Sequence, residues 1–303
     1  AFEAVVFALT KSDAKVIDSF DEVSAIGHRI VQGGAIFKGS CLIDDKALND
    51  IDELGALAPL HNPAHVLAIK ACVKTFGKEK PQVAVFDTSF HQTMPEHVYM
   101  FALPYEYYEK YGVRKYGAHG TSHKFVSERV ADIKGGAEGL KVIVCHIGNG
   151  ASITAVKGGK CVNTSMGFTP LGGIMMGTRC GDIDPAILPY IMKKTGMTPE
   201  EMDTTLNKKS GMLGISGVSS DARDVEAAVN AGNPRAQLTH DIYVNRVVNV
   251  VGGYVAQMGG VDAIAFTAGL GENDTTLREK ICKGLEEAFG LDMNYELNSK
   301  SRG

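Results

Sequence analysis

The chain has 303 residues, of which 44% are hydrophobic and 22% are charged, values typical of a folded globular protein of about two domains. Its 31 Lys and Arg residues against 35 Asp and Glu residues give a net charge of −4 without any long basic run, which argues against a broad nucleic-acid interface. The most apolar stretch, residues 247–260, is shorter than the roughly 20 residues that a membrane-spanning helix needs, so no membrane span is expected.

The first third of the chain contains one clear helix pattern and one clear strand pattern. Asn62 and Pro63 predict the N-cap and first residue of a helix, in which apolar residues recur at helical spacing as far as Phe76. Residues 83–86 form a short apolar run that predicts a central strand. Asp87 follows at its carboxyl end, where α/β enzymes keep their chemistry. Alone, this residue could be a general base, an anchor for a sugar or metal, or merely a cap.

A β-hairpin is predicted in the middle of the chain. Residues 141–147 and 151–156 are apolar and β-rich, and the turn Gly148-Asn149-Gly150 separates them. The backbone N–H groups of such a turn can form an anion-binding concavity, although a tight hairpin is the more common use of these glycines.

The last third predicts a helix, a strand and a glycine loop in that order. A capping box at residues 198–201 opens one helix, and a long helical pattern covers residues 235–258. Residues 263–267 predict a strand that leads into a glycine loop at 268–273. Because the chain has neither a P-loop nor a dinucleotide fingerprint, a phosphate would have to bind at this loop or at the hairpin turn.

Several polar residues lie in glycine-rich or turn-like contexts. His119 and His123 have a metal-compatible spacing if they lie on a helix, but no Glu follows the first His and no third ligand is evident. A cap or an anion contact is therefore favoured over zinc. Arg29, Arg179 and Arg223 carry the planar guanidinium that binds a carboxylate or phosphate through two parallel bonds, and a surface salt bridge is the alternative for each.

The six cysteines are scattered without a C-x-x-C pair, which favours reduced thiols in a cytoplasmic enzyme over a disulfide framework or a zinc ribbon. No signal peptide is visible at the first residues, which begin without Met. Both ends of the chain are expected to be cut.

The combination of five motifs is more specific than any one of them. Residues 85–95, 116–123, 146–150, 166–170 with 176–182, and 266–273 occur in the order and spacing of the acetate kinase (acetokinase) family. The resemblance runs from about Ile26 to Met293 and implies an α/β chain with the duplicated, ribonuclease-H-like two-domain fold of actin, hexokinase and Hsp70. An incomplete N-terminal domain at residues 1–88 and a nucleotide-binding and dimerisation domain at 89–303 are expected, divided where the composition changes at about 87–94.

The resemblance also implies a role for each matching residue. The catalytic residues would be Asp87, His119 and Arg179, and the substrate would be bound by Arg29, Val31, Leu60, Ala118 and Pro170. The nucleotide would be bound by His146, Ile147, Gly148, Asn149, Gly150, Asp221, Ala222, Arg223, Gly269, Leu270, Gly271, Glu272 and Asn273. These residue types suit phosphoryl transfer, because guanidinium, imidazole and oriented amide donors can stabilise the negative charge of the transferred group in the transition state.

The activity implied is reversible phosphoryl transfer from ATP to acetate, giving acetyl phosphate and ADP, by in-line transfer between domains that close on the substrates. Magnesium is expected as Mg-ATP. The family's own magnesium positions, an Asn in its opening loop and a Glu in its closing helix, lie outside these residues, so no metal ligand is assigned within the chain. A cytoplasmic homodimer is expected, without nucleic-acid or membrane partners.

Three alternatives remain open. The first is a propionate or butyrate kinase, because Ala118 stands where the family has a phenylalanine that lines the pocket for the acyl methyl group, which leaves room for a longer chain. The second is a truncated chain that binds nucleotide without catalysis. The third, a sugar kinase of the same superfold, fits the motifs around Asp87 and His119 less well.

Overall fold

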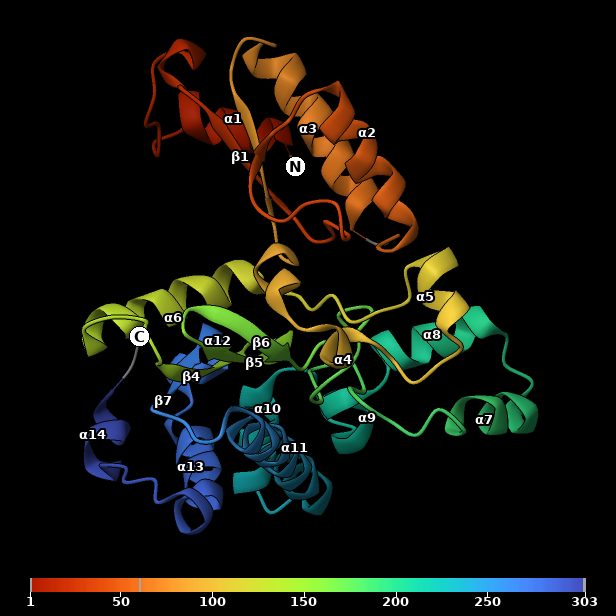
Figure 1. The fold of residues 1–303 in the computed structure, drawn as a ribbon, viewed down its shortest axis with the longest axis vertical. Helices are drawn as coiled ribbons and strands as arrows, with labels where there is room; N and C mark the ends of the chain where they lie inside the picture. The colour runs from red at the N-terminus through yellow and green to blue at the C-terminus, as the bar shows by residue number, and fades with distance from the viewer. Residues whose placement is uncertain (1, 60, 302–303) are drawn as a thin grey trace. The chain divides into compact units, whose positions relative to one another are not determined.

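The structure of the chain is a computed structural model that describes residues 2–59 and 61–301. The chain forms two compact units, the first ending at Gln92 and the second beginning at Thr93 (Figure 1). Each unit has a hydrophobic core of its own. The fold is mixed α/β throughout.

The first unit is built around a three-stranded sheet in the order β1-β3-β2. β1 (Ile26–Ile30) and β3 (Gln82–Phe86) are parallel, and β2 (Cys41–Leu42) is antiparallel to β3. Its helical elements are α1 (Phe2–Thr10), η1 (Phe20–Glu22), α2 (Asp45–Glu53), η2 (Leu54–Ala56), α3 (Asn62–Phe76) and η3 (Ser89–Thr93), the last of which reaches the first residue of the second unit. The predicted helix and the predicted central strand are both confirmed.

The prediction that Asn62 caps helix α3 is wrong. His61 is the N-cap residue and makes no side-chain cap bond, while Asn62 is the first helical residue and is fully buried. Its carboxamide accepts a hydrogen bond from Gln32 N (3.2 Å) and donates to Gln32 O (3.0 Å) and Ile51 O (3.1 Å). Buried backbone groups without partners are costly, so the carboxamide satisfies those groups instead of the helix end.

The second unit contains a four-stranded sheet in the order β6-β5-β4-β7. β4 (Lys141–Ile147), β5 (Ala151–Lys157) and β6 (Lys160–Thr164) are successive antiparallel strands, and β7 (Ala263–Thr267) runs parallel to β4. The predicted hairpin is therefore confirmed. Helix α6 (Gly120–Lys134) packs on one side of the sheet and α11 (Pro234–Met258) on the other (Figure 1). Strands β4 and β5 are buried on both faces because both faces of the sheet are covered.

The remaining helices of the second unit are α4 (Glu96–Tyr99), α5 (Tyr105–Tyr111), α7 (Ile187–Thr195), α8 (Pro199–Lys208), α9 (Gly211–Ser216), α10 (Ala222–Asn230), α12 (Ala268–Asn273), α13 (Thr275–Phe289) and α14 (Tyr295–Lys300). The predicted capping box is present at the start of α8, where Glu201 N donates to Thr198 Oγ1 (3.2 Å) and Thr198 N donates to Glu201 Oε2 (2.8 Å). The long helix is also confirmed as α11. None of the helices in the described ranges is both long and apolar enough to cross a membrane.

The predicted glycine loop after β7 is instead the short helix α12. Ala268 turns the chain out of the strand with φ +66°, and the Glu272 carboxylate accepts hydrogen bonds from Thr267 Oγ1 (3.1 Å) and Ala268 N (3.2 Å). The side chain thus folds back onto the start of its own helix and satisfies an N–H there. Glycine permits a loop but does not require one, and this local cap decides between the two.

Candidate active site

Arg29 and Asp87 form the polar centre of the first unit. They lie at the carboxyl ends of the parallel strands β1 and β3, where Arg29 is paired with Val85 in the strand register. Arg29 Nε donates to Asp87 Oδ1 (2.9 Å) and Nη2 donates to Oδ2 (2.5 Å). The Asp87 side chain is 1% exposed whereas that of Arg29 is 63% exposed, and the bond to Asp87 raises the pKa of Arg29.

This pair has a clear chemical consequence. A buried carboxylate is stable when a bidentate guanidinium compensates its charge, and Asp87 in turn fixes the direction of the Arg29 side chain. The largely exposed guanidinium retains N–H groups for an anion. Of the other substrate residues expected in this unit, Val31 is 8% exposed and Leu60 lies outside the described residues.

His119 is held at the start of α6 in a backbone conformation that is rare for a non-glycine residue, with φ 59°. Its Nδ1 is 2.8 Å from Ser152 Oγ, and its ring stacks on that of His146 with centroids 4.2 Å apart. The Nδ1 atom of His146 is 2.8 Å from Ser122 Oγ. Strain of this kind persists where the surroundings hold it, and here two serines and a second imidazole do so.

Arg179 and His119 converge on the space beside Gly150. A Cβ atom placed on Gly150 would lie 3.5 Å from His119 Nε2 and 3.6 Å from Arg179 Nη1. Arg179 Nη1 donates to Pro170 O (3.3 Å), and the side chain forms no salt bridge with any described residue. Burial lowers the pKa of Arg179, as expected for a cation removed from water without a carboxylate partner. A guanidinium and an imidazole therefore face the same small space at the hairpin turn.

Pro170 and Ala118, the two remaining residues predicted to bind the substrate, lie in different surroundings. Pro170 contacts Arg179 through its backbone carbonyl. Ala118 is 2% exposed and belongs to the hydrophobic core of the second unit, directly before His119 in the chain.

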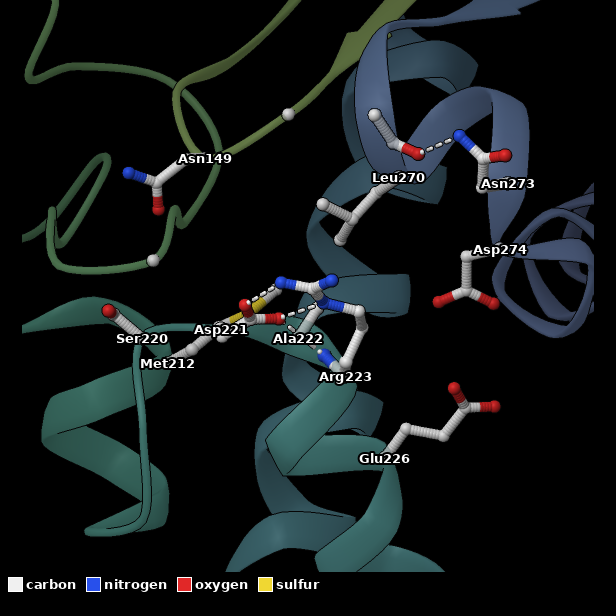
Figure 2. A pocket seen from close by; sticks show the side chains of 13 residues that line it. Asn149, Met212, Ser220, Asp221, Ala222, Arg223, Glu226, Leu270, Asn273 and Asp274 are labelled. Carbon is white, nitrogen blue, oxygen red and sulfur yellow. Dashed lines mark hydrogen bonds and ion pairs between the residues drawn. The ribbon is translucent and has the colours of Figure 1, made fainter. Parts of the chain in front are cut away.

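A pocket of about 650 Å³ lies next to the hairpin turn (Figure 2). Eight of its lining residues are among those predicted to bind nucleotide, namely Gly148, Asn149, Asp221, Ala222, Arg223, Gly269, Leu270 and Asn273. They come from the β4–β5 turn, the start of α10 and helix α12, three segments far apart in the sequence. A pocket of this size fits a drug-sized or nucleoside-sized ligand.

Arg223 and Asp221 form an ion pair in the lining of the pocket. Arg223 Nε and Nη2 donate to Asp221 Oδ1 (3.0 Å) and Oδ2 (2.5 Å), as the dashed lines in Figure 2 show. These bonds lower the pKa of Asp221 to about 2. Asn273 Nδ2 donates to Gly269 O (2.9 Å) across one turn of α12. The Arg223–Asp221 pair and the Asn273 carboxamide therefore give the pocket lining both hydrogen-bond donors and acceptors.

Other predicted nucleotide residues lie elsewhere. Ile147 is fully buried in the core, so its side chain cannot reach a ligand, and His146 stacks on His119. Gly271 and Glu272 line a different hollow of about 560 Å³.

Sequence reasoning also missed several residues at these sites. The pocket lining includes Gly177, Met212, Ser220, Glu226 and Asp274. Glu226 lies one helical turn beyond Ala222, so helical spacing along 222–230 could have identified it. Ser152, which bonds to His119, lies two residues beyond Gly150 and had no motif to identify it.

Within residues 2–59 and 61–301, no group of three His, Cys, Asp or Glu side chains could hold a metal ion. Between His119 and His123 lies the Ser152 hydroxyl, within hydrogen-bond distance of both rings.

Comparisons with known proteins agree on one family. A model of the acetokinase family matches residues 1–303. An acetate kinase of Treponema denticola is 56% identical over 304 residues, which cover 100% of this chain and 76% of that protein. The crystal structure of Porphyromonas gingivalis acetate kinase has 46% sequence identity and a TM-score of 0.95 over 100% of this chain and 75% of that one. A propionate kinase from Francisella tularensis has 45% identity and a TM-score of 0.92 over 99% and 76%.

Proposed function

The chain belongs to the acetokinase family, and from that premise we propose that it transfers a phosphoryl group reversibly between ATP and acetate, giving acetyl phosphate and ADP. The observation that carries this proposal is the convergence of His119 Nε2 and Arg179 Nη1 beside Gly150, at the edge of a nucleoside-sized pocket. In the reaction an acetate oxygen bonds to the γ-phosphorus while the bond from that phosphorus to the bridging oxygen of ADP breaks.

The pocket in Figure 2 supports a site for the adenosine of ATP. The carboxylates of Glu226 and Asp274 are suitable acceptors for ribose hydroxyls, and the backbone amides of Gly148 and Asn149 are suitable donors to the phosphates. Magnesium enters with the nucleotide as Mg-ATP and, when bound, neutralises charge on the phosphate oxygens. No described residue is assigned as its ligand.

The donors account for most of the chemistry. Charge spreads over the equatorial oxygens of the transferred group, so preorganised N–H donors from His119 and Arg179 stabilise the transition state more than the substrates. Arg29 holds the acetate carboxylate, and Asp87 keeps Arg29 in place through two hydrogen bonds. Neither carboxylate nor phosphate needs a protein nucleophile, because acetate itself attacks.

The setting of the enzyme follows from the family alone. We infer a cytoplasmic homodimer that acts on ATP or ADP and on acetate or acetyl phosphate. Light scattering on the purified protein measures the number of subunits, and a monomer at assay concentration contradicts the dimer.

Arg179 places its guanidinium beside Gly150, where the phosphoryl group is proposed to bind. Replacing it with alanine removes one preorganised donor, so kcat for acyl phosphate formation from acetate and Mg-ATP should fall by about 10²–10³, or on the order of 3–4 kcal/mol in the barrier. The product is measured by trapping as the hydroxamate. Arg129, an exposed residue of α6 paired with Asp132, provides the matched control, and Arg129→Ala should retain full activity.

Two results would contradict the proposal. Near-normal turnover by Arg179→Ala removes that residue from the mechanism. A wild-type protein that binds ATP but forms no acyl phosphate contradicts the enzyme function and supports a nucleotide-binding role.

Ala118 favours a second candidate activity, propionate or butyrate kinase. An alanine beside His119 provides more room than a phenylalanine, and each added CH₂ that fills such room is worth about 0.8 kcal/mol. We therefore predict that kcat/KM for propionate approaches that for acetate. A propionate kcat/KM far below that for acetate in the unmodified protein contradicts this specificity.

A further inference from the structure

Ser152 lies between two imidazole rings. It is the second residue of β5, is fully buried and stands opposite His146 in the strand pairing. Its Oγ is 2.8 Å from His119 Nδ1 and 2.7 Å from His123 Nε2. One hydroxyl therefore connects the ring that faces the candidate phosphoryl site with a fully buried ring one turn along α6.

The number of protons restricts how these three groups can bond. A hydroxyl has one proton to donate and two lone pairs that accept. With both imidazoles neutral, Ser152 donates to one ring nitrogen and accepts from the other. If His123 Nε2–H donates to Ser152, then Ser152 donates to His119 Nδ1, and the proton of His119 must be on Nε2.

The location of His119 Nε2 explains why its protonation matters for the proposed reaction. Nε2 lies at the space beside Gly150 that Arg179 Nη1 also reaches. A protonated Nε2 donates to a phosphoryl oxygen, whereas an unprotonated Nε2 presents a lone pair to an anion and repels it. In the opposite arrangement, with His119 Nδ1–H donating to Ser152, a neutral ring would present that lone pair.

We propose that Ser152 and His123 are positioning residues that keep the Nε2 proton of His119 directed at the transferred phosphoryl group. This inference rests on the proposed function. A hydroxyl is suited to the task because its two lone pairs can accept from both His119 Nδ1–H and His123 Nε2–H if the His119 ring becomes an imidazolium. The proton on Nε2 is thus retained in both charge states of His119.

A nearby hydroxyl allows this role to be separated from simple stabilisation. Thr154 lies two residues along β5, on the same face, and is also fully buried. Its Oγ1 is 2.8 Å from Thr164 Oγ1 on β6, so Thr154→Val removes a buried hydroxyl bond without touching an imidazole. Ser152→Ala and Thr154→Val should therefore cost similar stability but differ in catalysis.

The experiment compares the wild type with Ser152→Ala, Ser152→Thr and Thr154→Val. We expect kcat of Ser152→Ala to fall about 10- to 100-fold, the range found when the outer partner that orients a functional imidazole is removed, with KM for ATP and acetate nearly unchanged. Ser152→Thr keeps the hydroxyl and should recover most of the activity. Thr154→Val should have nearly wild-type kcat.

A direct readout is the nitrogen-15 spectrum of the histidine rings above their titration range, with the signals of His119 identified by their loss in His119→Gln. The wild type and Thr154→Val should show His119 protonated on Nε2, and Ser152→Ala should show both tautomers in exchange. An unchanged tautomer in Ser152→Ala together with a kcat loss no larger than that of Thr154→Val overturns the inference. If the wild type forms no acyl phosphate, the proposed function fails, and the spectra still decide where the proton is.

Discussion

At the scale of single residues, Arg29 in the first unit and Arg179 in the second are held in opposite ways. Arg29 has a bidentate carboxylate partner and a largely exposed side chain. Arg179 is half-buried, and among the described residues its guanidinium donates hydrogen bonds only to the Pro170 carbonyl and the sulfur of Met176. An anion at Arg179 therefore relieves an existing desolvation cost, while an anion at Arg29 adds to an arginine that is already oriented.

Gly150 provides the sharpest prediction at this scale. A methyl group there would lie 3.5 Å from His119 Nε2 and 3.6 Å from Arg179 Nη1, ordinary van der Waals distances that the fold can accommodate. The same methyl group occupies the space where a phosphoryl oxygen would accept from both nitrogens. Gly150→Ala should thus lose about 10²-fold or more in kcat/KM for Mg-ATP while its thermal unfolding changes little.

The control for this prediction is a glycine with free space around it. Gly253 lies inside α11 and an added Cβ there meets no atom within 4 Å, so Gly253→Ala should stabilise the helix by about 0.5–1 kcal/mol without affecting activity. If Gly150→Ala turns over at the same rate as Gly253→Ala, the space beside Gly150 does not hold the phosphoryl group.

At the scale of secondary-structure elements, the sequence predicted what depends on neighbouring residues. Strands β3, β4 and β5 follow from short apolar runs, and α8 follows from a capping box whose two side chains are three residues apart. Helix α11 follows from the helical spacing of apolar residues over 235–258. Each of these signals is local, so it can be identified from neighbouring residues alone.

The same reasoning failed where distant groups compete for a side chain. Asn62 is of a residue type that is favoured at N-caps, but backbone groups of Gln32 and Ile51 bind its carboxamide. This outcome depends on which chain segments pack together, which local spacing does not encode. Helix α12 is a different case, because the Glu272 carboxylate that caps it bonds to residues only four and five positions back, and the glycines of 268–273 obscured that local signal.

The residues of the candidate site also differ in whether the sequence could identify them. His119, Arg179 and Gly150 carry recognisable motifs, and the structure brings them to one point. Ser152 belongs to the same hydrogen-bond network but was missed, because its role appears only when the rings of His119 and His123 stand on either side of it. A motif identifies groups that would touch a ligand more readily than groups that orient them.

At the scale of the whole molecule, each of the two units contains a partly buried imidazole with an unsatisfied nitrogen. The Nε2 atom of His65 in the first unit and the Nδ1 atom of His240 in the second are buried without a hydrogen-bond partner among the described residues. Burial lowers the pKa of both rings below the ordinary histidine value of 6.5, and the charges of His61 beside His65 and of Lys280 beside His240 lower it further.

The sign of the resulting pH dependence is fixed by these shifts. Well above pH 6.5, the ordinary pKa of histidine, both rings are largely neutral in the folded and unfolded chain and contribute little to the pH dependence. As the pH falls below that value, the unfolded chain binds protons that the folded chain does not, so the free energy of unfolding decreases. Both units should therefore lose stability between about pH 7.5 and about pH 5.5.

Amide hydrogen exchange at the two pH values measures this for each unit separately, with β3 reporting on the first unit and β4 on the second. His65→Gln should reduce the acid sensitivity of β3, and His240→Gln should reduce that of β4, because glutamine stays neutral throughout. His97, an exposed residue of α4, provides the control, and His97→Gln should alter neither strand. Equal acid sensitivity in all three variants and the wild type would assign the effect to carboxylates instead, since these are the other groups that begin to titrate as the pH approaches 5.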